Sequence, residues 1–179
     1  NSLLRAQENI HHHYDIGNDF YKLWLDQQLL YTCAYFPSES MTLEQAQVAK
    51  MDHVCRKLQL KPGDQVVEAG CGWGALALHM AKNYGVRVSA YNIAKEQLAY
   101  ARERARHDGM DGLIEYIEGD YREIAGKFDA FISVGMLEHV GVEHYRMLGG
   151  VIDRCLKQNG RGLIHTIGVN RPSPLNPWI

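Results

Sequence analysis

Three glycines, Gly70, Gly72 and Gly74, alternate with other residues two positions after an acidic side chain, Glu68. A short apolar run precedes them and a helical pattern follows, so they occupy a turn between a strand and a helix. Glycine has no Cβ and therefore allows a sharp turn and a close approach of the backbone to a ligand. The segment predicts a ligand-binding loop, and the alternative is a glycine-rich turn without a ligand.

Two classes of cofactor use such a loop. Gly70 and Gly72, followed by Ala75, also satisfy the dinucleotide fingerprint, which requires an acidic residue about 20 positions further on to bind ribose. The second predicted strand instead ends in Tyr91 and Asn92, without a carboxylate. An acid that precedes the glycines suits a cationic ligand with one nucleoside, and this order is typical of S-adenosylmethionine-dependent methyltransferases. The sequence favours S-adenosylmethionine over a nicotinamide dinucleotide.

Other polar side chains follow the predicted strands at their carboxyl ends, where open α/β sheets bind ligands. The amide of Asn92 can bind ribose hydroxyls, Gln97 follows the same strand, and Tyr121 can lie against an adenine face. Glu138 follows the fourth strand, and His165 lies near the end of the fifth. The alternatives are a turn residue at 92, a charge at a helix N-terminus at 138 and a core histidine at 165. Together these residues predict one wall of a nucleoside pocket.

Motifs along nearly the whole chain resemble those of the cyclopropane fatty acid synthases and their mycolic acid relatives. They lie at 13–15, 18–21, 31–36, 42–47, 68–74, 135–141 and 165–168. The resemblance implies a Rossmann-like class I methyltransferase fold with S-adenosylmethionine as the cofactor. With the glycine loop, it implies these cofactor-binding residues: Tyr31, Thr32, Glu68, Gly70, Gly72, Gly74, Asn92, Gln97 and Tyr121.

The same resemblance implies a bicarbonate ion beside the sulfonium, held by Cys33, Glu138 and His165 with the backbone near Ile167. Tyr14 matches a tyrosine that also faces this site. An isolated alkene is a weak nucleophile and must be held in line with the reactive methyl in a dry pocket. Its attack leaves a carbocation, which aromatic faces and anions stabilise, and bicarbonate then removes a proton so that the ring closes. The alternative for Cys33 is a small packing residue.

The expected activity is therefore transfer of a methylene group to a cis double bond of a phospholipid acyl chain, forming a cyclopropane ring. Two other functions stay open. One is methyl transfer without ring closure, giving a methyl-branched fatty acid or an N-methylated amine. The other is a cofactor-binding module without catalysis. Cys33, Glu138 and His165 together favour ring formation, because methylation of an amine needs no bicarbonate.

Alternating strands and helices must position these residues. Strands are predicted at 65–69, 86–91, 113–117, 128–134 and 162–166, and helices at 75–84, 95–107 and 143–156. This alternation predicts a doubly wound, mostly parallel sheet. We expect residues 1–60 to form a helical cap that contributes to the active site, with a capping box at Thr42 and Gln45. Residues 61–179 are expected to form the Rossmann-like cofactor domain.

Composition narrows the class of protein further. The chain has 179 residues, 46% of them hydrophobic, and a net charge of −2, which suits a globular core and lacks the basic field of a nucleic-acid-binding protein. No apolar stretch reaches the ~18 residues that suggest a spanning helix. The four cysteines are spaced too widely for a metal site and are expected as free thiols in a cytoplasmic protein.

The resemblance also concerns the ends of the chain and its partners. Family members continue beyond Pro177 and Trp178 with further helices, antiparallel strands, a tyrosine of the bicarbonate site and much of the acyl-chain pocket. We therefore expect this chain to be the incomplete C-terminal side of a longer protein's cofactor domain, able to bind cofactor without turnover. The expected partners are unsaturated phospholipid acyl chains at the inner membrane surface, with peripheral association, and a second copy in a homodimer.

Overall fold

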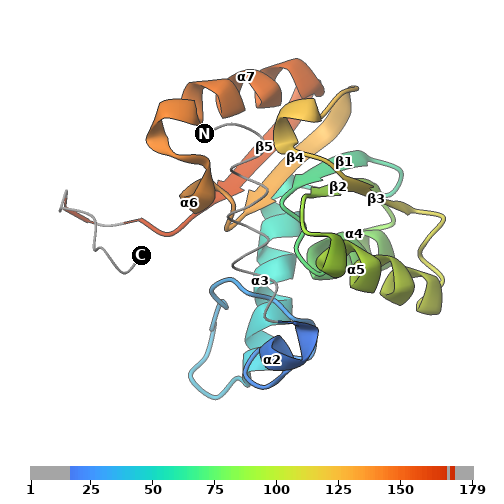
Figure 1. Cartoon of the computed structure of the whole chain (residues 1–179), viewed down its shortest axis with the longest axis vertical. Coiled ribbons are helices and arrows are strands. Elements are labelled where there is room, and N and C mark those ends of the chain that lie inside the picture. Colours follow the sequence, from blue (N-terminus) through green and yellow to red (C-terminus); the bar gives the residue numbers. More distant parts are fainter. Residues whose placement is uncertain (1–16, 169, 172–179) are drawn as a thin grey trace.

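The computed structural model describes residues 17–168, 170 and 171, and its centre is one sheet of five parallel strands. The strand order is β3-β2-β1-β4-β5, which confirms the predicted doubly wound α/β fold (Figure 1). The strands are β1 Gln65–Ala69, β2 Arg87–Asn92, β3 Ile114–Glu118, β4 Phe128–Val134 and β5 Leu156–His165. The order reverses between β1 and β4, and open sheets bind ligands outside the carboxyl ends of strands at this point.

Helices cover both faces of the sheet, with α3, α4 and α5 on one side and α7 on the other (Figure 1). Successive residues of a strand point to opposite faces, so Val66 packs with the first group of helices and Val67 with Leu148 and Val151 of α7. The helices are α2 Asn18–Lys22, α3 Leu43–Leu58, α4 Ala75–Tyr84, α5 Lys95–His107, α6 Leu137–Val140 and α7 Tyr145–Cys155, with short 3₁₀ turns η1 Tyr121–Glu123 and η2 Val142–His144.

Helix α3 begins at the predicted capping box. The Thr42 hydroxyl accepts the backbone N–H of Gln45 at 3.3 Å, and the Gln45 side chain accepts the backbone N–H of Thr42 at 3.0 Å. This reciprocal pair satisfies two N–H groups that a helix start otherwise leaves unpaired. The apolar side of α3 joins the core beneath the sheet, but its buried face also carries two polar residues, Gln47 and Lys50.

Two contacts connect the segment before α3 to the rest of the fold. The indole N–H of Trp73 donates to the Asn18 side chain at 2.7 Å. On the other side, the Arg104 guanidinium of α5 donates to the backbone carbonyl and the side-chain oxygen of Gln28 at 3.3 and 2.6 Å. Residues 18–58 therefore pack directly against the sheet domain, and the division at residue 60 stays a prediction.

The end of the sheet differs from the sequence prediction. The helix expected over 143–156 is split into η2 and α7, and β5 begins at Leu156 instead of residue 162. Leu156 pairs with Phe128, whereas the next pair joins Arg161 to Ala130, so the intervening residues form a bulge. Pairing with β4 creates this early strand start, and local periodicity carries no sign of it.

Neither a metal site nor a membrane span is found in the described part of the chain. No three of its His, Cys, Asp and Glu side chains are grouped to hold a metal ion. Over the same residues, no helix has the length and apolar character required to cross a bilayer. All four cysteines are free, with Cys33 exposed and the other three buried.

Candidate cofactor site

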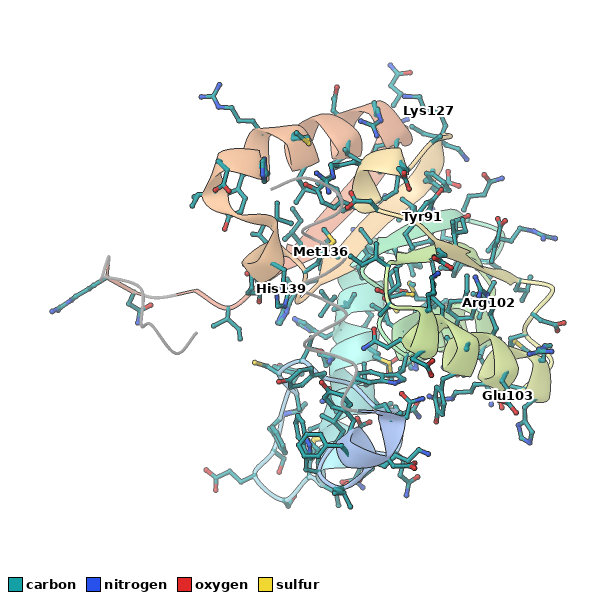
Figure 2. All side chains as sticks on the ribbon, in the orientation of Figure 1. Tyr91, Arg102, Glu103, Lys127, Met136 and His139 are labelled. Carbon is teal, nitrogen blue, oxygen red and sulfur yellow. The ribbon has the colours of Figure 1, made fainter. Side chains whose placement is uncertain are left out.

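A cavity of about 500 Å³, here called the cofactor cavity, opens at the carboxyl ends of the strands beside the switch point. Its walls are the glycine loop after β1, the ends of β2, β3 and β4, and residues 29–32 with one face of α3. Figure 2 shows Tyr91, Met136 and His139, which all line it, reaching the central region from different elements. The volume lies in the range typical of small-molecule sites.

The glycine loop forms the floor of the cavity through its first two glycines. Gly70 and Gly72 both have positive φ angles, +83° and +53°, which side-chain-bearing residues rarely adopt. The backbone N–H groups of Gly70 and Cys71 donate to the Tyr91 carbonyl, which ties the loop to the end of β2. A Cβ at Gly72 would meet no atom within 4 Å, so the backbone there faces open space that a ligand can approach.

Gly74 has a different role from the one expected, because it does not line the cavity. A Cβ at this position would lie 2.5 Å from the Tyr116 hydroxyl and 2.7 Å from the Ala101 Cβ. The Tyr116 hydroxyl also donates to the Gly74 carbonyl at 3.0 Å. The third glycine therefore allows α4 to begin in close contact with α5 and β3, and its contribution to the cofactor site is indirect.

Glu68 lies at the base of the cavity with only 3% of its surface exposed. Its Oε2 atom is buried without a hydrogen-bond partner in the described residues. Burial raises the pKa of this carboxyl to about 8, and the N–H of Ala77 and the Lys50 ammonium oppose the rise. An unpaired carboxylate oxygen in a cavity fits a cationic ligand, in agreement with the sequence argument.

Asn92 and Gln97 line the cavity, but the Asn92 side chain is already engaged. Its NH₂ group donates to the Gly72 carbonyl at 3.2 Å and to the Gln97 side-chain oxygen at 2.8 Å. Its oxygen accepts the backbone N–H groups of Ile93 and Ala94 at 2.8 and 3.3 Å. In this arrangement Asn92 holds the glycine loop against the start of α5, and the expected ribose contact of Asn92 stays a prediction.

Tyr121 stands at the far side of the cavity on η1. Asp120 caps this turn by accepting the Arg122 backbone N–H at 2.9 Å, and it also pairs with the Arg122 guanidinium at 2.6 Å. The guanidinium carbon lies 5.6 Å from the centre of the Tyr121 ring. The ring is thus held in place at the cavity, as its predicted contact with adenine requires.

Tyr31 and Thr32 close the cavity opposite the glycine loop. The Tyr31 ring is partly exposed and lies against Trp24, with the ring centres 5.2 Å apart. Thr32 accepts a hydrogen bond from Lys50 at 2.5 Å, and its methyl group lies 2.6 Å from where a Cβ of Gly135 would stand. Gly135 therefore has to be a glycine for Thr32 to approach the end of β4.

The predicted bicarbonate residues are brought together in part. The Glu138 carboxylate accepts the backbone N–H of Ile167 at 2.8 Å, so helix α6 and the segment after β5 meet as expected. The Nδ1 atom of His165 is buried, with no partner in the described residues. Cys33 is exposed, and none of Cys33, Glu138 and His165 lines the cofactor cavity. Tyr14 lies outside the described residues, and the bicarbonate site stays a prediction.

Several lining residues were not found from the sequence. Lys50 carried one usable signal, because it occupies a buried position in the helical pattern of α3, where lysine is rare. His139 follows Glu138 directly and faces the same cavity. The remaining residues carried no local signal because their position depends on the packing of distant elements. The residues that line the cavity and were not predicted include Lys50, Met51, Trp73, Tyr91, Arg122, Met136, His139 and His144.

Comparison with known proteins places this site in a family. The family model described as mycolic acid cyclopropane synthetase matches residues 1–176. The chain belongs to the mycolic acid cyclopropane synthetase family. This membership confirms the resemblance seen in the sequence motifs and assigns the chain to the S-adenosylmethionine-dependent methyltransferases.

Individual members of the mycolic acid cyclopropane synthetase family and related structures agree. The chain is 47% identical over 169 residues to the cyclopropane-fatty-acyl-phospholipid synthase of Escherichia coli K12, covering 93% of this chain and 43% of that protein. The crystal structure of the mycolic acid cyclopropane synthase CmaA1 with SAH and CTAB matches at a TM-score of 0.85 and 32% identity, over 88% of this chain and 55% of that one. A coclaurine N-methyltransferase structure with N-methylheliamine and SAH matches at a TM-score of 0.78 and 28% identity, over 90% and 50%.

Proposed function

We propose that the protein binds S-adenosylmethionine in the cofactor cavity and transfers a methylene group from it to a cis double bond of phospholipid acyl chains, forming a cyclopropane ring. The observation that carries the proposal is that every predicted cofactor-binding residue except Gly74 lines one cavity at the switch point. The 47% identity to a cyclopropane-fatty-acyl-phospholipid synthase supports the choice of substrate. Because the chain spans 43% of that relative, the activity of the whole protein is part of the proposal.

The residues present fit the cofactor. Bound S-adenosylmethionine supplies an electrophilic methyl group on a cationic sulfur. The unpaired Oε2 atom of Glu68 faces the cavity and can take a cationic group, while the open backbone at Gly72 admits the ligand. Tyr121 offers a flat face for adenine, and Tyr31 offers an aromatic face that stabilises positive charge as it develops on the lipid.

A small anion fits beside Glu138. His165 has a buried ring nitrogen without a described partner, and the Ile167 N–H already points to the Glu138 carboxylate. Bicarbonate carries both acceptor oxygens for these two donors and a hydroxyl that can donate to Glu138. We propose that these groups, with Cys33, would hold bicarbonate, which supplies a base for the proton that leaves the transferred methyl group.

We also propose that the substrate is met at the inner membrane surface by a cytoplasmic protein that associates peripherally, and that a homodimer is the working form. The lipid named in the E. coli relative supports the first part. Co-sedimentation with vesicles of unsaturated phospholipid measures the association, and analytical ultracentrifugation measures the oligomeric state. Protein that stays in the supernatant at every lipid concentration would contradict the membrane proposal.

The decisive experiment combines cofactor binding with product analysis. Titration calorimetry with S-adenosylhomocysteine measures binding, and mass spectrometry of lipids after incubation with S-adenosylmethionine and dioleoyl phospholipid vesicles identifies the product. Ring formation adds one CH₂ and consumes a double bond, whereas N-methylation adds the same mass and leaves the double bond intact. Cofactor binding without a lipid product from this chain would favour the N-methyltransferase or the non-catalytic alternative.

A substitution separates catalysis from binding. Glu138→Gln is expected to abolish most of the lipid product while the affinity for S-adenosylhomocysteine stays within twofold, since Glu138 lies outside the cofactor cavity. Glu143→Gln, an exposed glutamate on the neighbouring turn η2, is the matched control and is expected to keep the product. Equal product from wild type and Glu138→Gln would refute a catalytic role for Glu138.

A further inference from the structure

The segment 30–32 closes the cofactor cavity without belonging to a helix or a strand. No sheet ladder holds its backbone, so side chains from elsewhere must determine its position. On its N-terminal side the buried Asp26 carboxylate accepts the backbone N–H groups of Gln28 and Leu30 at 3.1 and 2.8 Å. These bonds shape the turn that leads into the segment, but they do not reach Thr32.

Two side chains of α3 hold the segment itself. The Gln47 amide donates to the backbone carbonyls of Leu30 and Thr32 at 3.3 and 3.0 Å. One turn further along the same face of the helix, the Lys50 ammonium donates to the Thr32 hydroxyl at 2.5 Å. Both side chains are buried, with 3% and 5% exposed, although lysine is almost never buried without a partner. Both donors converge on Thr32, which faces the cavity.

We propose that Gln47 and Lys50 are positioning residues that hold the segment 30–32 over the cofactor cavity, with Lys50 acting through the Thr32 hydroxyl. The cofactor half of this inference rests on the proposed function. The hold on the segment does not, because its hydrogen bonds are present in the ligand-free protein. Thr32 also packs against the position of Gly135, so the same hold fixes the segment against the end of β4.

A competing explanation assigns Lys50 to charge alone. Lys50 also lines the cavity, and it lies within electrostatic reach of Asp26 and Cys33 on the preceding loop and of Glu68 on β1. Burial lowers the pKa of Lys50 to about 8, and these three groups oppose that fall. If Lys50 served only to balance Glu68, its removal would weaken cofactor binding whether or not residue 32 carried a hydroxyl.

A double-mutant cycle separates the two explanations. Lys50→Met keeps the length of the side chain and removes the ammonium, and Thr32→Val removes the hydroxyl. Each is expected to weaken S-adenosylhomocysteine binding about tenfold, the size of one hydrogen bond to a charged group, and the double variant is expected to bind no worse than either single one. Thr32→Ser keeps the hydroxyl and is expected to bind within twofold of wild type. Lys57→Met, at an exposed position of α3, is the matched control.

The cycle overturns the proposal if Lys50→Met weakens binding by the same factor in the wild-type and Thr32→Val backgrounds, because Lys50 would then act independently of the hydroxyl. Circular dichroism melts show which variants are folded. If Lys50→Met does not fold, the pair Thr32→Val and Thr32→Ser still tests the hydroxyl at a half-buried position. Equal binding by these two would also overturn the proposal.

Hydrogen exchange tests the hold without any ligand. In Lys50→Met and Gln47→Leu, amides of the peptide over 29–35 are expected to exchange at least fivefold faster than in wild type, while peptides from α4 and β1 stay unchanged. Unchanged exchange over 29–35 in both folded variants would refute the positioning role. If wild type binds no S-adenosylhomocysteine, the proposed function fails, and this measurement still decides the role of Gln47 and Lys50.

Discussion

At the scale of single residues, Glu68 combines two demands that oppose each other. A carboxylate beside the glycine loop suits a cationic cofactor, yet its burial without a partner for Oε2 destabilises the charged form. The pKa of about 8 follows from this burial, so the native protein holds a proton on Glu68 at neutral pH. The site is therefore less stable than it could be in the absence of its ligand, which is common where binding requires a buried charge.

The first prediction concerns stability. The pKa of Glu68 is about 8 in the folded protein and 4.5 in the reference state, so its contribution to stability is present below pH 4.5 and is lost as the pH rises towards 8. Glu68→Gln cannot ionise, and its melting temperature is expected to exceed that of wild type by a margin that grows by several degrees between pH 5 and pH 8. Thermal unfolding at these pH values measures the margin. A margin independent of pH would show that Glu68 does not titrate in this range.

The second prediction concerns the proton itself. A cationic ligand next to Glu68 favours the carboxylate, so binding of S-adenosylmethionine is expected to release up to one proton at pH 7 and to strengthen as the pH rises towards 8. Titration calorimetry in buffers with different ionisation enthalpies counts the protons. Glu68→Gln is expected to release none, and an equal release from both proteins would assign the proton to another group.

At the scale of elements, the glycine loop serves both the ligand and the packing. Gly72 leaves open space on the cavity side, whereas Gly74 allows α4 to meet Tyr116 and Ala101. The sequence motif treats the glycines alike, but the neighbours of each one differ. Helix α3 is likewise divided along its length, because its apolar residues enter the core while Gln47 and Lys50 reach the cavity segment.

The third prediction tests this division. Gly74→Ala places a Cβ 2.5 Å from the Tyr116 hydroxyl and adds strain at a φ of +79°, so it is expected to reduce the free energy of unfolding by about 2–4 kcal/mol. Gly109→Ala is the control, since its φ is +68° but a Cβ there meets nothing within 4 Å. It is expected to lower the free energy of unfolding by about 1 kcal/mol from strain alone. Equal losses in urea unfolding would remove the packing role of Gly74.

At the scale of the whole molecule, the sheet brings distant segments to one rim. Residues 29–32, the loop after β1 and the residues after β2, β3 and β4 meet because parallel strands end on the same side of the sheet. Contacts such as Trp73 to Asn18 and Arg104 to Gln28 hold the segment before α3 against that rim. A ligand in the cavity therefore touches segments from both parts of the chain and stabilises their contact.

The fourth prediction follows from this arrangement. Saturation with S-adenosylmethionine at about 100 times its dissociation constant is expected to stabilise the fold by about 2.7 kcal/mol, which raises the melting temperature by roughly 5–10 °C for a chain of this size. Differential scanning fluorimetry measures the shift. Gly72→Ala places a methyl group in the space where the ligand approaches, so its melting temperature is expected to stay unchanged on addition of the cofactor. A shift as large as that of wild type would mean that Gly72 does not face the ligand.

The amino-acid sequence alone determined the five-strand alternation, the capping box at Thr42, the pairing of Glu68 with the glycine loop, and the family. These features depend on residues a few positions apart, so the local pattern contains them. Only the tertiary structure decided that Gly74 packs against Tyr116, that Asn92 is engaged by the glycine loop, and that Lys50 reaches Thr32. Each of these contacts joins residues 18 or more positions apart, and the register of the strands and the docking of α3 bring them together.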